Sequence, residues 1–132
     1  MKLSLFEDLN KDEEFILDLK KFTQTYPDKV EMKILLANKY RKLEQYEKAV
    51  KIYSEIINNK LLSSNWNIFY SRGISYERMN DWNKAEKDLK EAMRLNPDDP
   101  YILNYLAYSW LDRNKNVEKA LSLLKKAVEI EP

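Results

Sequence analysis

The sequence predicts an all-α fold built from pairs of antiparallel helices. The chain has one glycine and four prolines in 132 residues, which leaves little material for hairpins and wide loops. Small residues also recur with aromatic residues at a period of about 34, the length of one two-helix repeat. A hydrophobic fraction of 44% beside a charged fraction of 34% suits helices that bury one face and expose the other.

The repeat is anchored on three small residues, Ala37, Gly73 and Ala107. An aromatic residue follows each anchor at the third position, and a second small residue follows at the twelfth or thirteenth. Two further positions, seven and then five residues later, complete the pattern. The residues at these positions are Tyr40, Tyr76 and Trp110; Ala49, Ala85 and Ala120; Ile56, Ala92 and Ala127; and Leu61, Pro97 and Pro132.

This pattern resembles the tetratricopeptide repeat, in which a first helix carries a large residue, leucine, a small residue and an aromatic one. A second helix carries alanine, a large residue and alanine before a final proline. Three motifs are expected, at about 30–63, 66–99 and 100–132. The third fits best, and the second departs at Arg72, where leucine is usual. The first has Lys33, Ile56 and Leu61 in place of the large residue, the alanine and the proline. The resemblance implies a right-handed α-solenoid.

Capping residues predict where the helices begin and end. Asp99 is expected to cap a helix that has Pro100 at its first position. Asn80 is expected in the left-handed conformation that ends a helix, with Asp81 as the next N-cap, and Asn114 and Asn116 repeat this scheme. The expected helices are 12–25, 29–43, 46–58, 65–79, 82–95, 100–113 and 117–130.

Residues 1–28 precede the three motifs, which are expected to form one continuous domain over 29–132. Two interpretations stay open for this leading segment. Aligning Pro27 with Pro97 places Phe6 at the aromatic position and makes 12–25 the second helix of a degenerate half repeat. Its apolar positions would then be Phe15, Leu19 and Phe22. The alternative is a single amphipathic helix.

Glycine inside a helix costs roughly 1 kcal/mol relative to alanine, so Gly73 requires a reason. It is expected to allow close packing against the helix that starts at Trp82, through Ala85. Gly73→Ala should then be tolerated, and Gly73→Leu should unfold the second motif.

The last expected helix is as apolar as an internal one, although a solenoid needs a polar terminal face. The sequence is therefore interpreted as a fragment of a longer array. Self-association through this uncapped end is an alternative.

The resemblance also implies a concave groove lined by the first helix of each motif. Tyrosine and asparagine, which suit partner binding, are most frequent among the groove positions of the third motif. A peptide or helix of a partner is expected across Tyr70, Tyr101, Asn104 and Tyr108, unless Tyr101 and Tyr105 only pack on neighbouring helices. The groove positions are Glu31, Ile34, Asn38 and Arg41; Asn67, Tyr70, Ile74 and Glu77; and Tyr101, Asn104, Tyr108 and Leu111.

One subtype of the family binds the C-terminal carboxylate of heat-shock chaperones. Only Asn38 matches its set of basic and asparagine residues. Ile34, Ser71, Tyr101 and Tyr105 stand at the other positions, so this activity is not expected.

Composition excludes several kinds of chemistry. Without cysteine or histidine there is no disulfide, no thiolate, no zinc site of these residues and no histidine-activated nucleophile. One glycine rules out a glycine-rich phosphate loop. The neighbouring carboxylates Glu13–Glu14 and Asp98–Asp99 face different ways. Catalysis, metals and cofactors are therefore not expected.

The leading hypothesis is a non-catalytic scaffold that binds a protein or peptide. A helical-repeat RNA binder is the alternative, but the net charge of +1 and the acidic Glu31 and Glu77 count against nucleic acid. An enzyme whose catalytic domain lies outside this chain is also considered. No apolar run approaches the ~20 residues of a membrane span. The start is not a signal peptide. The compartment is left open between the cytoplasm and, if a signal lies upstream of this fragment, the periplasm.

Overall fold

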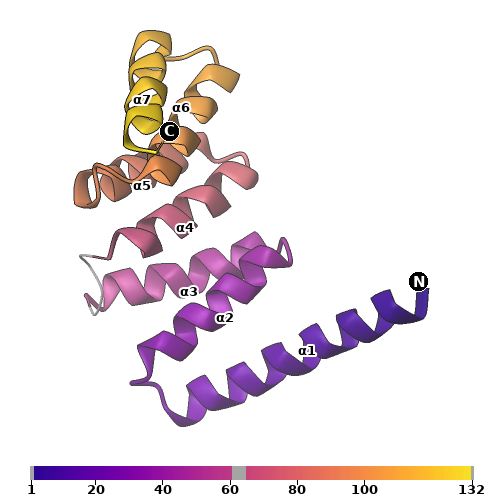
Figure 1. Cartoon of the computed structure of the whole chain (residues 1–132). Helices are drawn as coiled ribbons and strands as arrows, with labels where there is room; N and C mark the ends of the chain where they lie inside the picture. The colour runs from indigo at the N-terminus through magenta and orange to yellow at the C-terminus, as the bar shows by residue number, and fades with distance from the viewer. Residues whose placement is uncertain (1, 61–64, 132) are drawn as a thin grey trace. The chain divides into compact units, whose positions relative to one another are not determined.

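The computed structural model describes residues 2–60 and 65–131, with side chains from residue 8 onward. This part of the chain contains helices and no strand, so the predicted all-α class is confirmed (Figure 1). The helices are α1 (Lys2–Thr25), α2 (Val30–Lys42), α3 (Tyr46–Asn58), α4 (Trp66–Arg78), α5 (Trp82–Leu95), α6 (Pro100–Asp112) and α7 (Val117–Ile130).

The bounds of α2 to α7 agree with the predicted helices to within one residue at each end. The predicted start of the first helix at residue 12 is wrong, because α1 already begins at Lys2. No glycine or proline interrupts residues 2–25, so nothing in the sequence ends a helix there. The half-repeat interpretation required Phe6 at an aromatic position, but the side chain of Phe6 lies outside the described residues.

The helix ends show which capping predictions hold. Asp99 Oδ1 accepts hydrogen bonds from the backbone N–H groups of Tyr101 at 2.9 Å and Ile102 at 3.2 Å. Asn80 and Asn114 have the expected positive φ of 63° and 52°. Asn116 is the N-cap residue of α7, as predicted, but it has φ 47° and its side chain makes no capping bond. An N-cap normally has extended backbone, which brings its side chain onto the free N–H groups.

The chain divides into two compact units, residues 1–61 and 62–132. Unit 1 contains α1, α2 and α3. Its buried apolar side chains come from all three helices. They include Ala37 and Tyr40, the small and the aromatic residue of the first motif. The other buried apolar side chains of the unit are Leu19, Leu36, Ala49, Tyr53 and Ile56.

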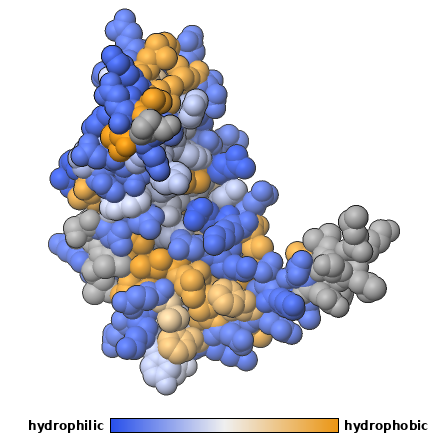
Figure 2. Space-filling model, in the orientation of Figure 1, coloured by the Kyte–Doolittle hydropathy of each residue, from blue (hydrophilic) through white to orange (hydrophobic). Residues whose placement is uncertain are grey.

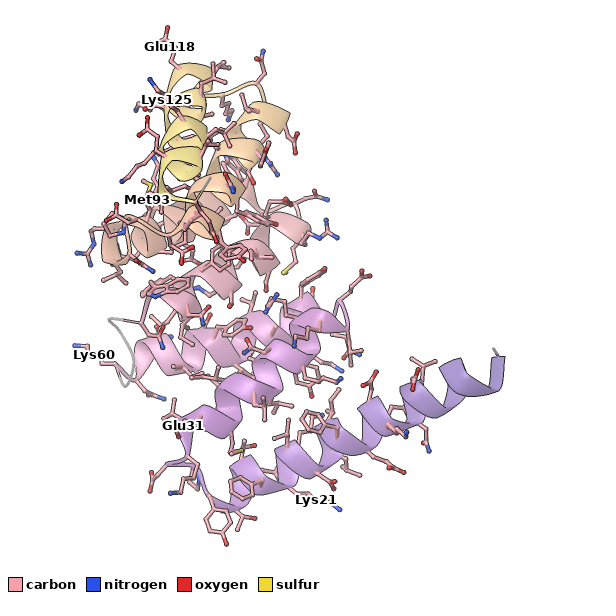
Figure 3. The ribbon with its side chains drawn as sticks, in the orientation of Figure 1. Lys21, Glu31, Lys60, Met93, Glu118 and Lys125 are labelled. Carbon is pink, nitrogen blue, oxygen red and sulfur yellow. The ribbon has the colours of Figure 1, made fainter. Side chains whose placement is uncertain are left out.

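Unit 2 contains α4 to α7, two antiparallel helix pairs. Its core cluster joins Leu89 of α5 to residues of α6 and α7, and the partly buried Trp82 and Met93 pack against it. Figure 3 labels Met93. The cluster consists of Leu89, Leu106, Ala107, Trp110 and Ala120. The small and aromatic positions of the third motif are therefore core positions, as the repeat pattern requires. The single continuous domain expected over 29–132 stays a prediction.

Gly73 lies in a tight contact between α4 and α5. A Cβ atom placed on it would meet Leu89 Cδ2 and Cγ at 3.1 Å and Asp88 Cβ at 3.3 Å. The contact expected through Ala85 is therefore corrected, since the nearest atoms belong to residues about one turn further along α5. Leu89 reaches Gly73 because a helical side chain leans toward the N-terminus of its helix and covers the preceding turn.

The departure at Arg72 is matched by a second departure on α5. Arg72 Nε donates to Asp88 Oδ2 at 2.7 Å, and Arg72 Nη2 donates to Asp88 Oδ1 at 2.8 Å. The side chain of Asp88 is only 4% exposed and that of Arg72 17%. By the repeat spacing, the same two positions hold Leu36 and Ile52 in the first motif and Leu106 and Leu123 in the third. One motif thus has a buried ion pair where the others have two apolar residues.

Candidate functional site

Unit 2 contains a groove of about 400 Å³ between α4 and α6, which we call the tyrosine groove. On α6 the lining residues follow helical spacing, and on α4 Tyr70 and Glu77 lie two turns apart, so each helix contributes one stripe. The stripe on α4 consists of Tyr70, Glu77 and Arg78, and that on α6 of Tyr101, Asn104, Tyr105, Tyr108, Ser109 and Asp112.

Tyr105 forms the ordered centre of this groove. Its ring meets that of Tyr70 edge to face, with centroids 6.0 Å apart and an interplanar angle of 83°. Its hydroxyl donates to Glu77 Oε1 at 3.4 Å. Burial raises the pKa of the Tyr105 hydroxyl well above its ordinary value, and the negative charge of Glu77 raises it further. Tyr105 is therefore a packing residue, as the alternative interpretation held.

Tyr101 and Tyr108 are different, because they are 69% and 58% exposed at the edge of the groove. Tyr101 was the other residue in the packing alternative, and its exposure shows that little of its ring packs within unit 2. Asn104 lies between them, half-buried, on the same stripe of α6. Two exposed aromatic rings and an amide thus stand on one helix face.

The structure brings five of the predicted site residues together in the tyrosine groove: Tyr70, Glu77, Tyr101, Asn104 and Tyr108. Ile74 and Leu111 are half-buried and do not line it, and Leu111 packs against the core cluster instead. Asn67 is exposed at the start of α4, where its backbone N–H donates to Asn65 Oδ1 at 2.9 Å.

Two of the four groove positions predicted in unit 1, Asn38 and Arg41, meet at the buried Tyr53. Both bond to the hydroxyl of the buried Tyr53, which donates to Asn38 Oδ1 and accepts from Arg41 Nε at 3.4 Å. These polar groups satisfy a buried hydroxyl, so part of their hydrogen-bonding capacity is used inside the unit.

Sequence reasoning missed Arg78, Ser109 and Asp112. Asp112 is four residues after the predicted Tyr108, and Ser109 is four residues after Tyr105. Extending the helical spacing by one turn from these two tyrosines would have found Ser109 and Asp112. Arg78 lies directly beside Glu77 and could not be found in this way.

The groove presents aromatic rings and hydrogen-bonding groups together. Its titratable side chains are carboxylates, one guanidinium and tyrosines. No group of three or more acidic residues is placed to hold a metal ion within residues 8–60 and 65–131. In the same part of the chain, no helix combines the length and the apolar character of a membrane span.

Comparisons with known proteins agree with the repeat pattern. Residues 70–132 match the family model described as tetratricopeptide repeat. The TPR repeat-containing protein PA4667 of Pseudomonas aeruginosa is 33% identical over 89 residues, which are 67% of this chain and 15% of that protein. The BBSome complex member BBS4 of Mus musculus is 31% identical over 91 residues, 68% of this chain and 16% of that protein. The chain thus spans about a sixth of the length of these relatives.

Solved structures show the same fold. MamA from Desulfovibrio magneticus RS-1 matches with a TM-score of 0.83 at 15% identity, over 95% of this chain and 69% of that chain. A structure titled MamA MSR-1 C2 matches with a TM-score of 0.78 at 21% identity, over 96% of this chain and 71% of that chain. At these identities the likeness concerns the fold alone.

Proposed function

This chain is a tetratricopeptide repeat protein, and from that premise we propose that its tyrosine groove binds a segment of a partner protein. The observation that carries the proposal is the exposure of Tyr101 and Tyr108, at 69% and 58%. Tyrosine offers a large apolar ring and a hydroxyl with little side-chain entropy to lose, which is why protein interfaces are rich in it. Both rings stand on α6, which the core cluster of unit 2 holds in place.

The size and polarity of the groove favour a peptide segment. A volume of about 400 Å³ accommodates a few side chains rather than a folded domain. Asn104 can donate to and accept from a peptide backbone at once. An extended strand or one face of a helix meets both conditions.

The proposed role is non-catalytic and does not involve nucleic acid. The groove carries the carboxylates of Glu77 and Asp112, which repel a phosphate backbone. A salt titration with single-stranded RNA tests this alternative. Binding that weakens steeply as salt increases would favour the RNA-binding function.

The groove is tested by affinity capture from native cells. Partners retained by the wild type are expected to be lost from Tyr108→Ala plus Asn104→Ala. A matched control is Tyr26→Ala plus Asn58→Ala, because both of these residues are exposed in unit 1 and outside the groove. Equal recovery of every partner with the groove variant, at an unchanged melting temperature, would refute the proposal.

Self-association through α7 is a second candidate, favoured by an exposed apolar stripe. Val117, Leu121 and Val128 are 40%, 56% and 64% exposed and lie on one face of the helix. Val117 and Val128 correspond by repeat spacing to Trp82 and Met93 of α5, which pack against the core cluster shared with α6. The stripe therefore resembles a surface that another helix covers within this same chain.

Light scattering tests self-association directly. We expect a concentration-dependent increase in mass that Leu121→Lys plus Val128→Lys abolishes. A wild type that stays strictly monomeric would exclude this candidate.

A further inference from the structure

Unit 1 contains a second groove, formed where α1, α2 and α3 meet, which we call the lysine groove. It consists of two adjoining hollows of about 330 Å³ and 310 Å³, both lined by Lys20, Tyr40 and Lys48. Ile16 of α1 lines the first hollow and Ile52 of α3 the second. The groove thus has an apolar floor and a cationic rim.

The lysines converge on a single aromatic ring. Lys20 Nζ of α1 lies 5.8 Å from the ring centroid of Tyr40, and Lys48 Nζ of α3 lies 5.5 Å from it. Lys51 adds a third ammonium group along the second hollow. Among the ion pairs of the described residues, none involves any of these three lysines.

This arrangement leaves an unbalanced charge beside apolar surface. Two ammonium groups held over one ring repel each other, and the repulsion is stronger beside a low-dielectric floor than in bulk water. The carboxylates of Glu13 and Glu55 also line the hollows but form no ion pair with the lysines. An occupant that brings its own carboxylates would relieve the repulsion.

We propose that the lysine groove binds an acidic amphipathic helix of a partner protein. Two adjoining hollows suit two large apolar side chains one turn apart on a helix, the spacing of anchors in helix-in-groove recognition. Glutamate or aspartate beside these anchors would meet Lys20, Lys48 and Lys51. This site is separate from the tyrosine groove and does not depend on the function proposed there.

A protein helix fits these observations better than an anionic bilayer. The hollows are concave, with volumes of about 330 Å³ and 310 Å³ that accommodate a few side chains each, whereas a bilayer presents a broad surface. Glu13 and Glu55 would be repelled by a uniformly anionic surface, but a helix can place its carboxylates beside the lysines alone. Unit 1 does expose large apolar side chains, and Figure 2 shows hydrophobic surface gathered over α1 and α2, so the bilayer is included as an outcome of the test.

The test measures fluorescence anisotropy of a labelled helical peptide with leucine at i, i+4 spacing and glutamate at the positions that flank the leucine face. A second peptide keeps the leucines and replaces every glutamate with lysine. The groove variant is Lys20→Gln, Lys48→Gln, Lys51→Gln. The control variant is Lys11→Gln, Lys21→Gln, Lys29→Gln, which removes the same charge at exposed positions of unit 1 outside the groove. Figure 3 shows Lys21 pointing away from α2 and α3.

We expect the glutamate peptide to bind the wild type and the groove variant to weaken it by at least about tenfold, as for close charge pairs at an interface. The control variant should change the affinity less than about twofold. Restoring the charges with Lys→Arg at the three groove positions should recover binding. An equal loss in the control, tighter binding of the lysine peptide, or binding of phosphatidylserine vesicles without binding of the peptide would each overturn the proposal.

A fourth variant keeps the test decisive if the groove variant fails to fold. Leu17 lines the first hollow and is 52% exposed, so Leu17→Ser should leave the circular dichroism melt unchanged. It should still weaken the glutamate peptide severalfold. An unchanged affinity in this variant would count against an apolar anchor in the groove.

Discussion

Asp88→Leu should destabilise unit 2 by about 3–5 kcal/mol, while Arg72→Leu plus Asp88→Leu should restore most of the stability. The single change removes the carboxylate that receives two bonds of 2.7 Å and 2.8 Å and leaves a guanidinium whose side chain is 17% exposed. Burial acts to lower the pKa of Arg72, but the hydrogen bond and charge of Asp88 outweigh it and raise the pKa. Asp88→Leu removes these two contributions, but a guanidinium keeps its proton in proteins even when it is buried, so Arg72 cannot escape the cost by losing a proton.

The double variant should differ because it copies the neighbouring motifs. Leu106 and Leu123 already occupy these two positions in the third motif. Replacing a buried ion pair by apolar residues of similar volume is often neutral or stabilising by about 1–4 kcal/mol. The Arg72 guanidinium also lies 5.9 Å and 5.6 Å from the ring centroids of Phe69 and Tyr76. Leucine at position 72 loses these cation–π contacts but can still pack its apolar side chain against the two rings. We therefore expect the double variant within about 1 kcal/mol of the wild type.

Urea unfolding followed by tryptophan fluorescence measures this prediction. All three tryptophans of the chain, Trp66, Trp82 and Trp110, belong to unit 2, so the signal reports that unit alone. The four proteins of the cycle give the coupling energy between the two side chains. The reasoning would be refuted if Asp88→Leu cost less than about 1 kcal/mol, or if the double variant lost the sum of the two single losses.

Three further predictions concern stability. The free energy of unfolding of Gly73→Ala in urea should stay within about 1 kcal/mol of the wild type, because the gain in helix propensity is offset by the 3.1 Å approach to Leu89. Gly73→Leu should lose the cooperative unfolding transition of unit 2. The folded protein holds the Tyr105 proton more tightly than the unfolded chain does, so the contribution of Tyr105 to stability is complete below a pH of about 10 and falls above it. Urea midpoints measured between pH 9 and 11 should therefore fall less for Tyr105→Phe than for the wild type. An equal fall would contradict this prediction. Asp99→Ala should cost about 1 kcal/mol of unfolding free energy and Asn116→Ala much less, since only Asp99 makes capping bonds; equal losses would contradict the assignment.

The helices could be predicted from the sequence because their ends carry chemical signals. Each signal acts through a local bond or backbone angle that depends on few neighbours. Asp99 caps the start of a helix, Pro100 occupies the first position of that helix, and Asn80 ends another. The start of α1 lacked any such signal, and the half-repeat alignment placed a boundary where the backbone has none. Tertiary detail was harder. The repeat spacing brought Arg72 to the helix interface, but the partner Asp88 required a comparison of the second helices as well.

The candidate site shows the same division. A stripe on α6 could be predicted because Tyr101, Asn104 and Tyr108 follow helical spacing. Which tyrosine is half-buried could not be predicted, because this depends on how α4 and α6 pack: the Tyr105 hydroxyl donates to Glu77, whereas Tyr108 is 58% exposed. In unit 1, the lysine groove involves residues of three helices that are distant in sequence, so no single stripe reveals it.

The net charge of +1 conceals two grooves of opposite character. The tyrosine groove has two carboxylates and one guanidinium among its lining groups, and the lysine groove has three ammonium groups and two carboxylates. An average over the chain cancels these charges, but the charges in direct contact with a bound segment are those that line its own groove. Binding at the lysine groove should therefore weaken as salt rises, while binding to the rings of Tyr101 and Tyr108 should change little. The salt dependence of a captured partner thus indicates which groove holds it, before any residue is substituted.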